Sequence, residues 1–243
     1  MKIGSIIIPL AVAVTVSAGT VIWNGPRAEV DWYAAANWKD GVAPTAEDVV
    51  VFPDKFGPGF AAVIGSGNVT IKSLAMNGGM IFANFGSLTV SGDVIQKGNS
   101  ALQTRAGNDS RIQINGNYQA RGGMLRMLQD NPGGVVVKGN LTAANSFTFC
   151  FNLNQSKQFG SVRVEGALQL NSAKLQLERY EEAVAAAEKL ILIRSVSGQE
   201  TSGTFSNAAF GTAYNVNGKR YTLQMIDFDG DGVKNDIALV KEK

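Results

Sequence analysis

The chain of 243 residues contains no histidine, the side chain that most often serves as a general base, a transition-metal ligand or a pH switch. Without histidine, the serines also lack the partner that most often activates a hydroxyl nucleophile. Charged residues are scarce too, at 17% with a formal net charge of +2, and lysine and arginine are scattered along the chain. We therefore expect no nucleic-acid partner, because such partners select concentrated positive charge.

Cysteine occurs once, at Cys150, so the chain cannot form an intramolecular disulfide. Cys150 alternates with aromatic residues in the run SFTFCFNL (146–153), a pattern typical of a strand. We expect it to be a small buried hydrophobic residue rather than a reactive thiol.

Long hydrophobic runs are also rare, and the one present extends from Ile3 to Val16 behind Lys2. The small residues Ser17 and Ala18 follow it, which predicts a secretory signal peptide over residues 1–18 with cleavage after Ala18. A retained membrane anchor is the alternative, although the run is shorter than the ~20 residues that span a bilayer. We expect the mature chain to be secreted, extracellular or on the cell surface, with no membrane insertion after cleavage.

Glycine, in contrast, is abundant at 28 residues, and it marks an internal repeat. Four ten-residue segments align without gaps: SLTVSGDVIQ (87–96), RIQINGNYQA (111–120), GVVVKGNLTA (134–143) and SVRVEGALQL (161–170). Their glycines, Gly92, Gly116, Gly139 and Gly166, follow one another at intervals of 24, 23 and 27 residues. A weaker copy, NVTIKSLAMN (68–77), has Ser73 at the glycine position. This spacing predicts one strand-bearing unit in each repeat.

Apolar and polar residues alternate within each repeat, which places Leu88 and Val90, for example, on one face of a short strand. The shared glycine allows a bend where a side chain would crowd the backbone. Stacked repeats would set like residues above like, so we predict an all-β fold, most simply a right-handed parallel β-helix (β-solenoid) over residues 61–178. An antiparallel β-sandwich is the alternative, because it also has turns at this spacing.

Both flanking regions depart from the repeat and are predicted to cap the solenoid, whose open ends would expose strand edges and core. The N-terminal cap, residues 19–60, holds all three tryptophans, Trp23, Trp32 and Trp38, which are expected to plug the core. The C-terminal cap, residues 179–243, is entered through ERYEEAVAAAEK (178–189), which favours a short helix or an extended loop. The runs LILIRSV (190–196), GTFSN (203–207) and KRYTLQM (219–225) are predicted to be closing strands.

Two terminal patterns resemble a known group of proteins. The first comprises Trp23-x-Gly25, Asp31-Trp32, Asn37-Trp38, Gly41, Pro44 and Asp48 followed by VVVF; the second runs from GTFSN through YNVNGKRYTLQ (214–224) to DGDGVKNDIALV (229–240). Together with the repeats, they resemble bacterial secreted and surface proteins that carry autotransporter-associated β-strand repeats. The resemblance implies a β-helical extracellular protein with a structural, adhesive or surface-display role, and these motifs carry no enzyme activity.

The segment DFDGDGVKND (227–236) is the sharpest candidate for a metal site. Its predicted ligands are Asp227, Asp229, Asp231, the carbonyl of Val233, Asn235 and Asp236. Loops that bind Ca²⁺ have carboxylates at alternate positions followed by a glycine. Here Ala238 occupies the position at which a bidentate glutamate would complete such a loop. We therefore expect at most weak binding, at ~10⁻⁴ to 10⁻³ M. The alternative is an acidic turn without metal before the last strand.

The sequence favours a non-enzymatic structural or adhesive protein whose partner is a surface polysaccharide or a second copy of itself. A carbohydrate-binding module is the alternative, with the tryptophan segment as a platform for sugar rings. A polysaccharide lyase or hydrolase is less favoured, because such chemistry needs paired carboxylates and the acids of the repeats are isolated. These acids are Asp93, Asp109, Asp130 and Glu165. Asp93 shares its repeat position with Asn117 and Asn140, which predicts a stacked side-chain ladder instead.

Overall fold

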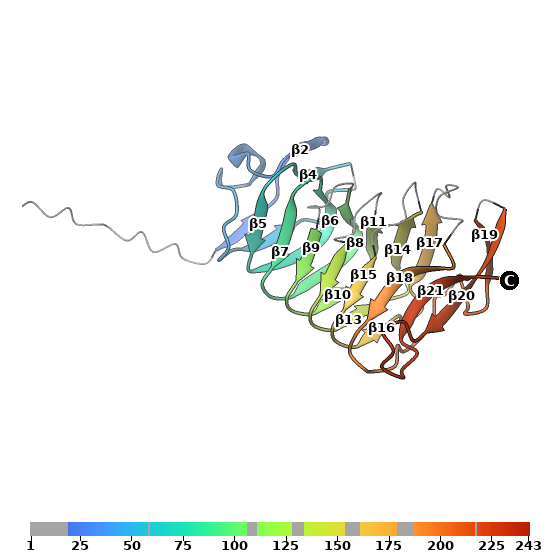
Figure 1. Cartoon of the computed structure of the whole chain (residues 1–243). Coiled ribbons are helices and arrows are strands. Elements are labelled where there is room, and N and C mark those ends of the chain that lie inside the picture. The colour runs from blue at the N-terminus through green and yellow to red at the C-terminus, as the bar shows by residue number, and fades with distance from the viewer. Residues whose placement is uncertain are drawn as a thin grey trace, which may run out of the picture.

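The computed structural model describes residues 19–57, 59–105, 111–127, 134–153, 161–178, 187–216 and 218–243. In this part of the chain all regular structure is β except one 3-10 helix, η1 (Ala35–Asn37). The chain winds as a parallel β-solenoid of about five turns (Figure 1), which confirms the predicted fold class. The predicted signal peptide, residues 1–18, and most of the predicted helix, residues 179–186, lie outside the described residues.

The first face of the solenoid is a ladder of short parallel strands. It consists of β5 (Asn68–Ile71), β7 (Ser87–Val90), β9 (Arg111–Ile114), β12 (Val135–Val137), β15 (Val162–Val164) and β18 (Lys189–Ser195). The register sets Leu88 beside Ile112, Ile112 beside Val135 and Val135 beside Val162, and all four side chains are buried. Because strands of successive repeats pair in parallel, the antiparallel sandwich alternative is wrong.

The second and third faces share two long strands, β6 (Ser73–Ala83) and β8 (Val94–Thr104). The second face adds β1 (Thr20–Ile22), β3 (Val49–Phe52), β10 (Tyr118–Ala120), β13 (Leu141–Ala143) and β16 (Leu168–Gln169). The third face adds β2 (Glu29–Asp31), β4 (Ala61–Ile64), β11 (Gly123–Met127), β14 (Phe147–Asn152) and β17 (Lys174–Glu178). β8 turns from one face to the next at Gly98, whose φ of +65° is a conformation that other residues rarely adopt.

Each sequence repeat corresponds to a strand of the first face, a corner and a strand of the second face. The glycines of successive repeats stack at this corner, where the N–H of Gly116 donates to the Gly92 carbonyl and the N–H of Gly139 donates to the Gly116 carbonyl, both at 3.1 Å. A Cβ added at Gly116 would lie 2.4 Å from Asp93 Oδ1 and 2.5 Å from the carbonyl carbon of Gly92. Glycine is therefore required because stacked backbone fills the space of a side chain.

The predicted side-chain ladder follows directly after the stacked glycines. Asp93 Oδ1 accepts the backbone N–H of Asn117 at 2.7 Å, and Asn117 Oδ1 accepts that of Asn140 at 3.0 Å. Asn140 Oδ1 continues the series by accepting the N–H of Ala167 at 2.8 Å. The ladder confirms the interpretation that these side chains support the coil.

The three tryptophans plug the N-terminal end of the core, as predicted. Trp23, Trp32 and Trp38 are at most 2% exposed. Trp38 packs edge-on against both of the others, with ring centroids 5.0 Å from Trp23 and 4.8 Å from Trp32, and its Nε1 donates to the Trp32 carbonyl at 2.8 Å. Parallel pairing already begins here, with β1 on β3 and β2 on β4.

At the C-terminal end the first face continues as an antiparallel sheet in the order β18, β21 (Asp236–Lys241), β20 (Lys219–Ile226) and β19 (Ala213–Val216). Two of the three predicted closing strands correspond to β18 and β20. The third prediction is wrong, because residues 203–207 form no strand. Phe205 of this segment is instead buried against Phe149, and the Asn207 side chain exchanges two hydrogen bonds with the backbone of Leu175.

Candidate functional site

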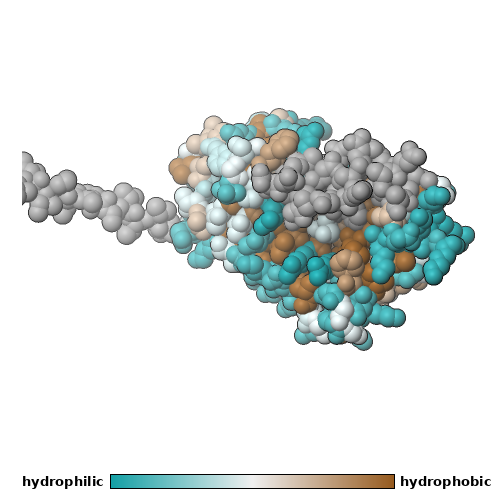
Figure 2. Space-filling model, viewed as in Figure 1, coloured by the Kyte–Doolittle hydropathy of each residue, from teal (hydrophilic) through white to brown (hydrophobic). Residues whose placement is uncertain are grey.

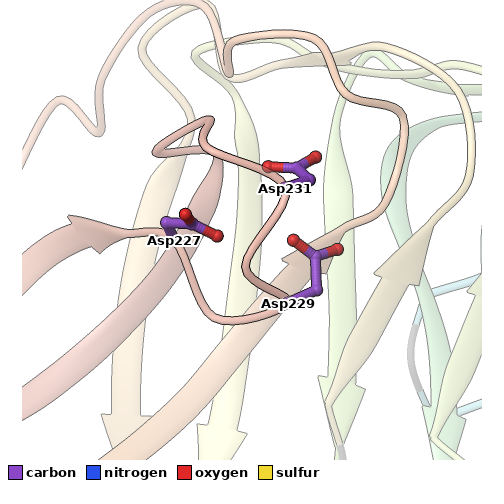
Figure 3. Close-up of side chains that lie close together, drawn as sticks. All are labelled: Asp227, Asp229 and Asp231. Atoms are coloured by element: carbon purple, nitrogen blue, oxygen red, sulfur yellow. The ribbon is translucent and has the colours of Figure 1, made fainter.

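The acidic turn between β20 and β21 brings together three of the predicted metal ligands. One carboxylate oxygen each from Asp227, Asp229 and Asp231 lies within 4.8 Å of the other two, and Figure 3 shows the three side chains around the space that the turn encloses. Asp227 Oδ1 accepts the N–H of Gly230 at 2.7 Å, and its Oδ2 accepts that of Gly232 at 3.0 Å. The turn is thus tightened by one of the carboxylates that would bind an ion.

The other three predicted ligands have partners elsewhere or lie buried. Asp236 is fully buried, and its two oxygens accept the N–H groups of Ser195 at 3.1 Å and Phe228 at 2.9 Å. Burial, and then the charge of Asp229, raises the pKa of Asp236 above the ordinary aspartate value. The Val233 carbonyl accepts the N–H of Asn235 at 3.1 Å. Asn235 is itself buried, and its side-chain amide forms no hydrogen bond with the described residues.

The arrangement of the three exposed or half-exposed aspartates fits a single hard cation. Ca²⁺ takes oxygen ligands at about 2.3 to 2.6 Å, so two ligands on opposite sides of one ion stand about 5 Å apart. The spacing of Asp227, Asp229 and Asp231 satisfies this limit without a change of backbone. Asp229 and Asp231 are exposed to water, which favours weak binding of the kind expected from the sequence.

A second candidate site is a groove of about 610 Å³ on the outside of the first face, over β5, β7 and β9. It is lined by Gly67, Asn68, Phe85, Ser87, Leu88, Thr89, Arg111 and Gln113. Register places Asn68 beside Ser87 and Ser87 beside Arg111, and it places Thr89 beside Gln113 in the adjacent row. The groove therefore offers rows of hydroxyl, amide and guanidinium groups on a rigid sheet.

Phe85 is the aromatic residue of this groove, and it is 59% exposed. Its φ of +65° is unusual for a bulky residue and costs of order 1 to 3 kcal/mol. Sequence reasoning missed Phe85, because it precedes the repeat that begins at Ser87 and belongs to no pattern. The one sequence feature that could have indicated Phe85 is its position directly before Gly86 and a strand with polar residues.

The tryptophan segment is not the sugar platform that the carbohydrate-binding alternative required, because all three rings are buried in the core. The described acids of the repeats also have structural partners. Asp93 belongs to the ladder, and Glu165 lies 3.4 Å from the guanidinium of Arg163. Asp109 and Asp130 lie outside the described residues.

Cys150 is fully buried, as predicted, on the side of β14 that faces away from the core rings of Phe149 and Phe151. Burial, and then the charge of Glu178, raises the pKa of the Cys150 thiol to about 12. The thiolate required for nucleophilic chemistry is therefore strongly disfavoured.

Comparison with family models, curated proteins and solved structures gave no match for this chain. The described part of the chain contains no helix long and apolar enough to cross a membrane.

Proposed function

We propose that this chain is a secreted, non-enzymatic β-solenoid with a structural or adhesive role outside the cell or on its surface. The observation that carries the proposal is a continuous stack of coils whose ends are both covered. The tryptophan plug covers one end. At the other end the antiparallel strands β21, β20 and β19 continue the first face, and the segment with the buried Phe205 and with Asn207 packs on the third face. Hydrophilic residues gather over this second end (Figure 2), as a terminal cap in contact with water requires.

The exposed side-chain ladder at the corner supports a mechanical role. Asp93, Asn117 and Asn140 link successive coils through hydrogen bonds from side chain to backbone, in addition to the parallel strand pairing. The coils that carry these residues are therefore held to one another at this corner as well as along the faces. Such a rod keeps its outer surfaces in fixed positions, which suits display or adhesion. As in the resembling surface proteins, we assign no catalytic residue.

Carbohydrate binding is the second candidate, and the groove beside Phe85 favours it. An exposed aromatic ring offers a flat apolar surface to a sugar, while Asn68, Gln113 and Arg111 offer hydrogen bonds to its hydroxyls. The volume of the groove, about 610 Å³, is in the range for small-ligand sites. A surface polysaccharide is thus the proposed external partner, and adhesion and binding would be one activity.

Self-association is the other partner class in the proposal. β2 pairs with a strand on one side only among the described residues, so it presents an edge to which another chain could add. Light scattering over a range of protein concentrations distinguishes the two partners. Particle mass that rises with concentration supports assembly, and a constant monomer mass leaves the polysaccharide.

The full chain expressed in a bacterial host tests the proposal through cell fractionation followed by binding to purified surface polysaccharides. We expect export and retention on a polysaccharide matrix, with retention lost in Phe85→Gly. Glycine accepts the positive φ, so the melting temperature of this variant should not fall. Val42→Ala, which shortens a 61% exposed side chain far from the groove in sequence, is the control. Cytoplasmic retention would contradict the extracellular role, and equal binding by Phe85→Gly would contradict the groove.

A further inference from the structure

Asp48 is a buried carboxylate at the N-terminal end of the solenoid, and it is 6% exposed. Its Oδ2 accepts hydrogen bonds from the backbone N–H of Thr45 at 2.8 Å and from the Thr45 hydroxyl at 2.7 Å. Its Oδ1 accepts the backbone N–H of Gly19 at 3.0 Å. No lysine or arginine among residues 19–57 and the other described segments forms an ion pair with it.

These hydrogen bonds determine the charge of Asp48. Burial by itself would raise the pKa of Asp48, but the hydrogen bonds from Thr45 and Gly19 outweigh burial and lower the pKa below the ordinary aspartate value. Asp48 is therefore an anion at neutral pH. A buried carboxylate without a counter-charge lowers the stability of the folded protein, and a positive charge next to Asp48 would stabilise it.

Both backbone polar groups of Gly19 form hydrogen bonds. Its N–H donates to Asp48 Oδ1 at 3.0 Å, and its carbonyl accepts the N–H of Val49 at 2.9 Å. The next residue, Thr20, begins β1 and pairs with Val49 on β3. The first strand of the solenoid thus starts directly after Gly19, with no linker between them.

The predicted signal-peptide cleavage site is the bond between Ala18 and Gly19. Hydrolysis of this amide by water leaves a carboxylate on Ala18 and an amine on Gly19, and the amine is protonated at neutral pH. We propose that the Ala18–Gly19 bond is the processing site and that the new Gly19 ammonium forms an ion pair with Asp48. Cleavage then supplies the missing counter-charge and fastens the first strand to the N-terminal end of the stack.

The inference rests on the secretion part of the proposed function and is independent of adhesion. Protein recovered after export of the full chain provides the first test, through the mass of its N-terminal peptide. We expect this peptide to begin at Gly19. An exported protein that begins elsewhere would overturn the inference and leave the proposed function intact, whereas an uncleaved chain retained in the cytoplasm would contradict both.

The second test measures the charge pair in the exported protein labelled with ¹⁵N-glycine. An ordinary α-amine has a pKa of about 7.7 to 8.0, and the carboxylate of Asp48 should raise that of Gly19 above this range. Asp48→Asn should return it to the ordinary range, and Asp40→Asn, an exposed aspartate of the same segment, should not. An ordinary amine pKa in the wild-type protein would overturn the pairing, even if Asp48→Asn fails to fold.

Acetylation of the Gly19 amine separates charge from hydrogen bonding, because the acetylated nitrogen keeps one N–H for Asp48 and loses the positive charge. We expect acetylation of the unfolded chain, followed by refolding, to lower the melting temperature by about 2 to 4 °C. The decrease should vanish in Asp48→Asn. In each protein the comparison is between samples that carry the same number of acetylated lysines and differ only in acetylation of the Gly19 amine. An equal decrease in both proteins would count against the ion pair.

Discussion

Asp93 Oδ1 accepts the backbone N–H of Asn117, which lies 24 residues later and one coil further along the solenoid, at 2.7 Å. Asn117 repeats this contact toward Asn140, so each side chain of the ladder belongs to one coil and stabilises the next. The contact joins residues that are equivalent in sequence and adjacent only in the folded stack. Removing this contact therefore tests how much the ladder stabilises one coil against the next.

Asn117→Ala removes the acceptor for the Asn140 N–H and one donor to Asp93. We expect a loss of about 0.5 to 1.5 kcal/mol in the free energy of unfolding, the usual net value of a hydrogen bond. Denaturant titration measures this loss. Gln224→Ala, at an exposed polar position on β20, is the control and should change stability little. An Asn117→Ala protein as stable as wild type would show that the ladder does not contribute to the stability of the fold.

Gly116→Ala tests the stacked glycines. Its new Cβ would stand 2.4 Å from Asp93 Oδ1 and against the backbone of Gly92, which cannot move without disturbing the coil. We expect a cost of about 1 to 3 kcal/mol from overpacking, measured by thermal or denaturant unfolding. Gly65→Ala is the matched control, because a Cβ there has no neighbour within 4 Å. Similar costs at both positions would mean that backbone freedom, rather than space, selects the glycine.

Trp32→Ala tests the plug. Trp32 is 1% exposed, and removing a large core side chain costs about 3 to 5 kcal/mol, so the melting temperature should fall sharply. The native protein should also emit tryptophan fluorescence at the short wavelengths of buried indole. Val42→Ala, at an exposed position of the same segment, should stay within about 0.5 kcal/mol of wild type. Emission typical of water-exposed indole would contradict the buried plug.

Calcium at about 10 mM should raise the melting temperature by about 3 to 6 °C if the acidic turn binds with a Kd near 10⁻³ M, because a ligand of the folded state stabilises it by mass action. The double substitution Asp229→Ala with Asp231→Ala should abolish the increase. Asp40→Ala, at an exposed aspartate far from the turn in sequence, should retain it. A wild-type protein without any shift would identify the turn as a purely structural element.

The Cys150 thiol should resist alkylation in the native protein at pH 8 and react readily in denaturant. Its pKa is raised to about 12 in the folded state, compared with about 8.5 in an unfolded chain. The contribution of the protonated thiol to the free energy of unfolding is therefore fully present below about pH 8.5. It is lost as the pH rises toward 12, because over this range only the unfolded state loses the proton. Cys150→Ala should remove this part of the alkaline loss. Rapid native labelling would contradict the burial of the thiol.

Many features of the fold could be predicted from local patterns. The spacing of Gly92, Gly116 and Gly139 indicates a coil of 23 or 24 residues, and apolar alternation indicates which side of each strand faces inward. The shared repeat position of Asp93, Asn117 and Asn140 indicates the ladder. These predictions succeed because in a solenoid each repeat contacts its neighbours, so residues at equivalent positions in sequence become neighbours in space.

The less regular parts could not be predicted in the same way. The segment 203–207 has strand-like composition, but its backbone follows β17, where the Asn207 side chain replaces strand pairing. The metal-ligand pattern from 227 to 236 includes Asp236, yet the structure turns this carboxylate toward Ser195 and Phe228. In both cases a contact with a strand that is distant in sequence decides the outcome.

The sequence by itself determined that the chain repeats, that its strands alternate between core and exterior, and that its tryptophans lie outside the repeat. Only the tertiary structure decided that strands pair in parallel, that Phe85 lies beside a polar groove, and that the Gly19 nitrogen meets Asp48. The physical reason is the range of the interactions. Periodicity is recorded along the chain, whereas a groove or a contact such as that between the Gly19 nitrogen and Asp48 exists only where the coils bring remote residues together.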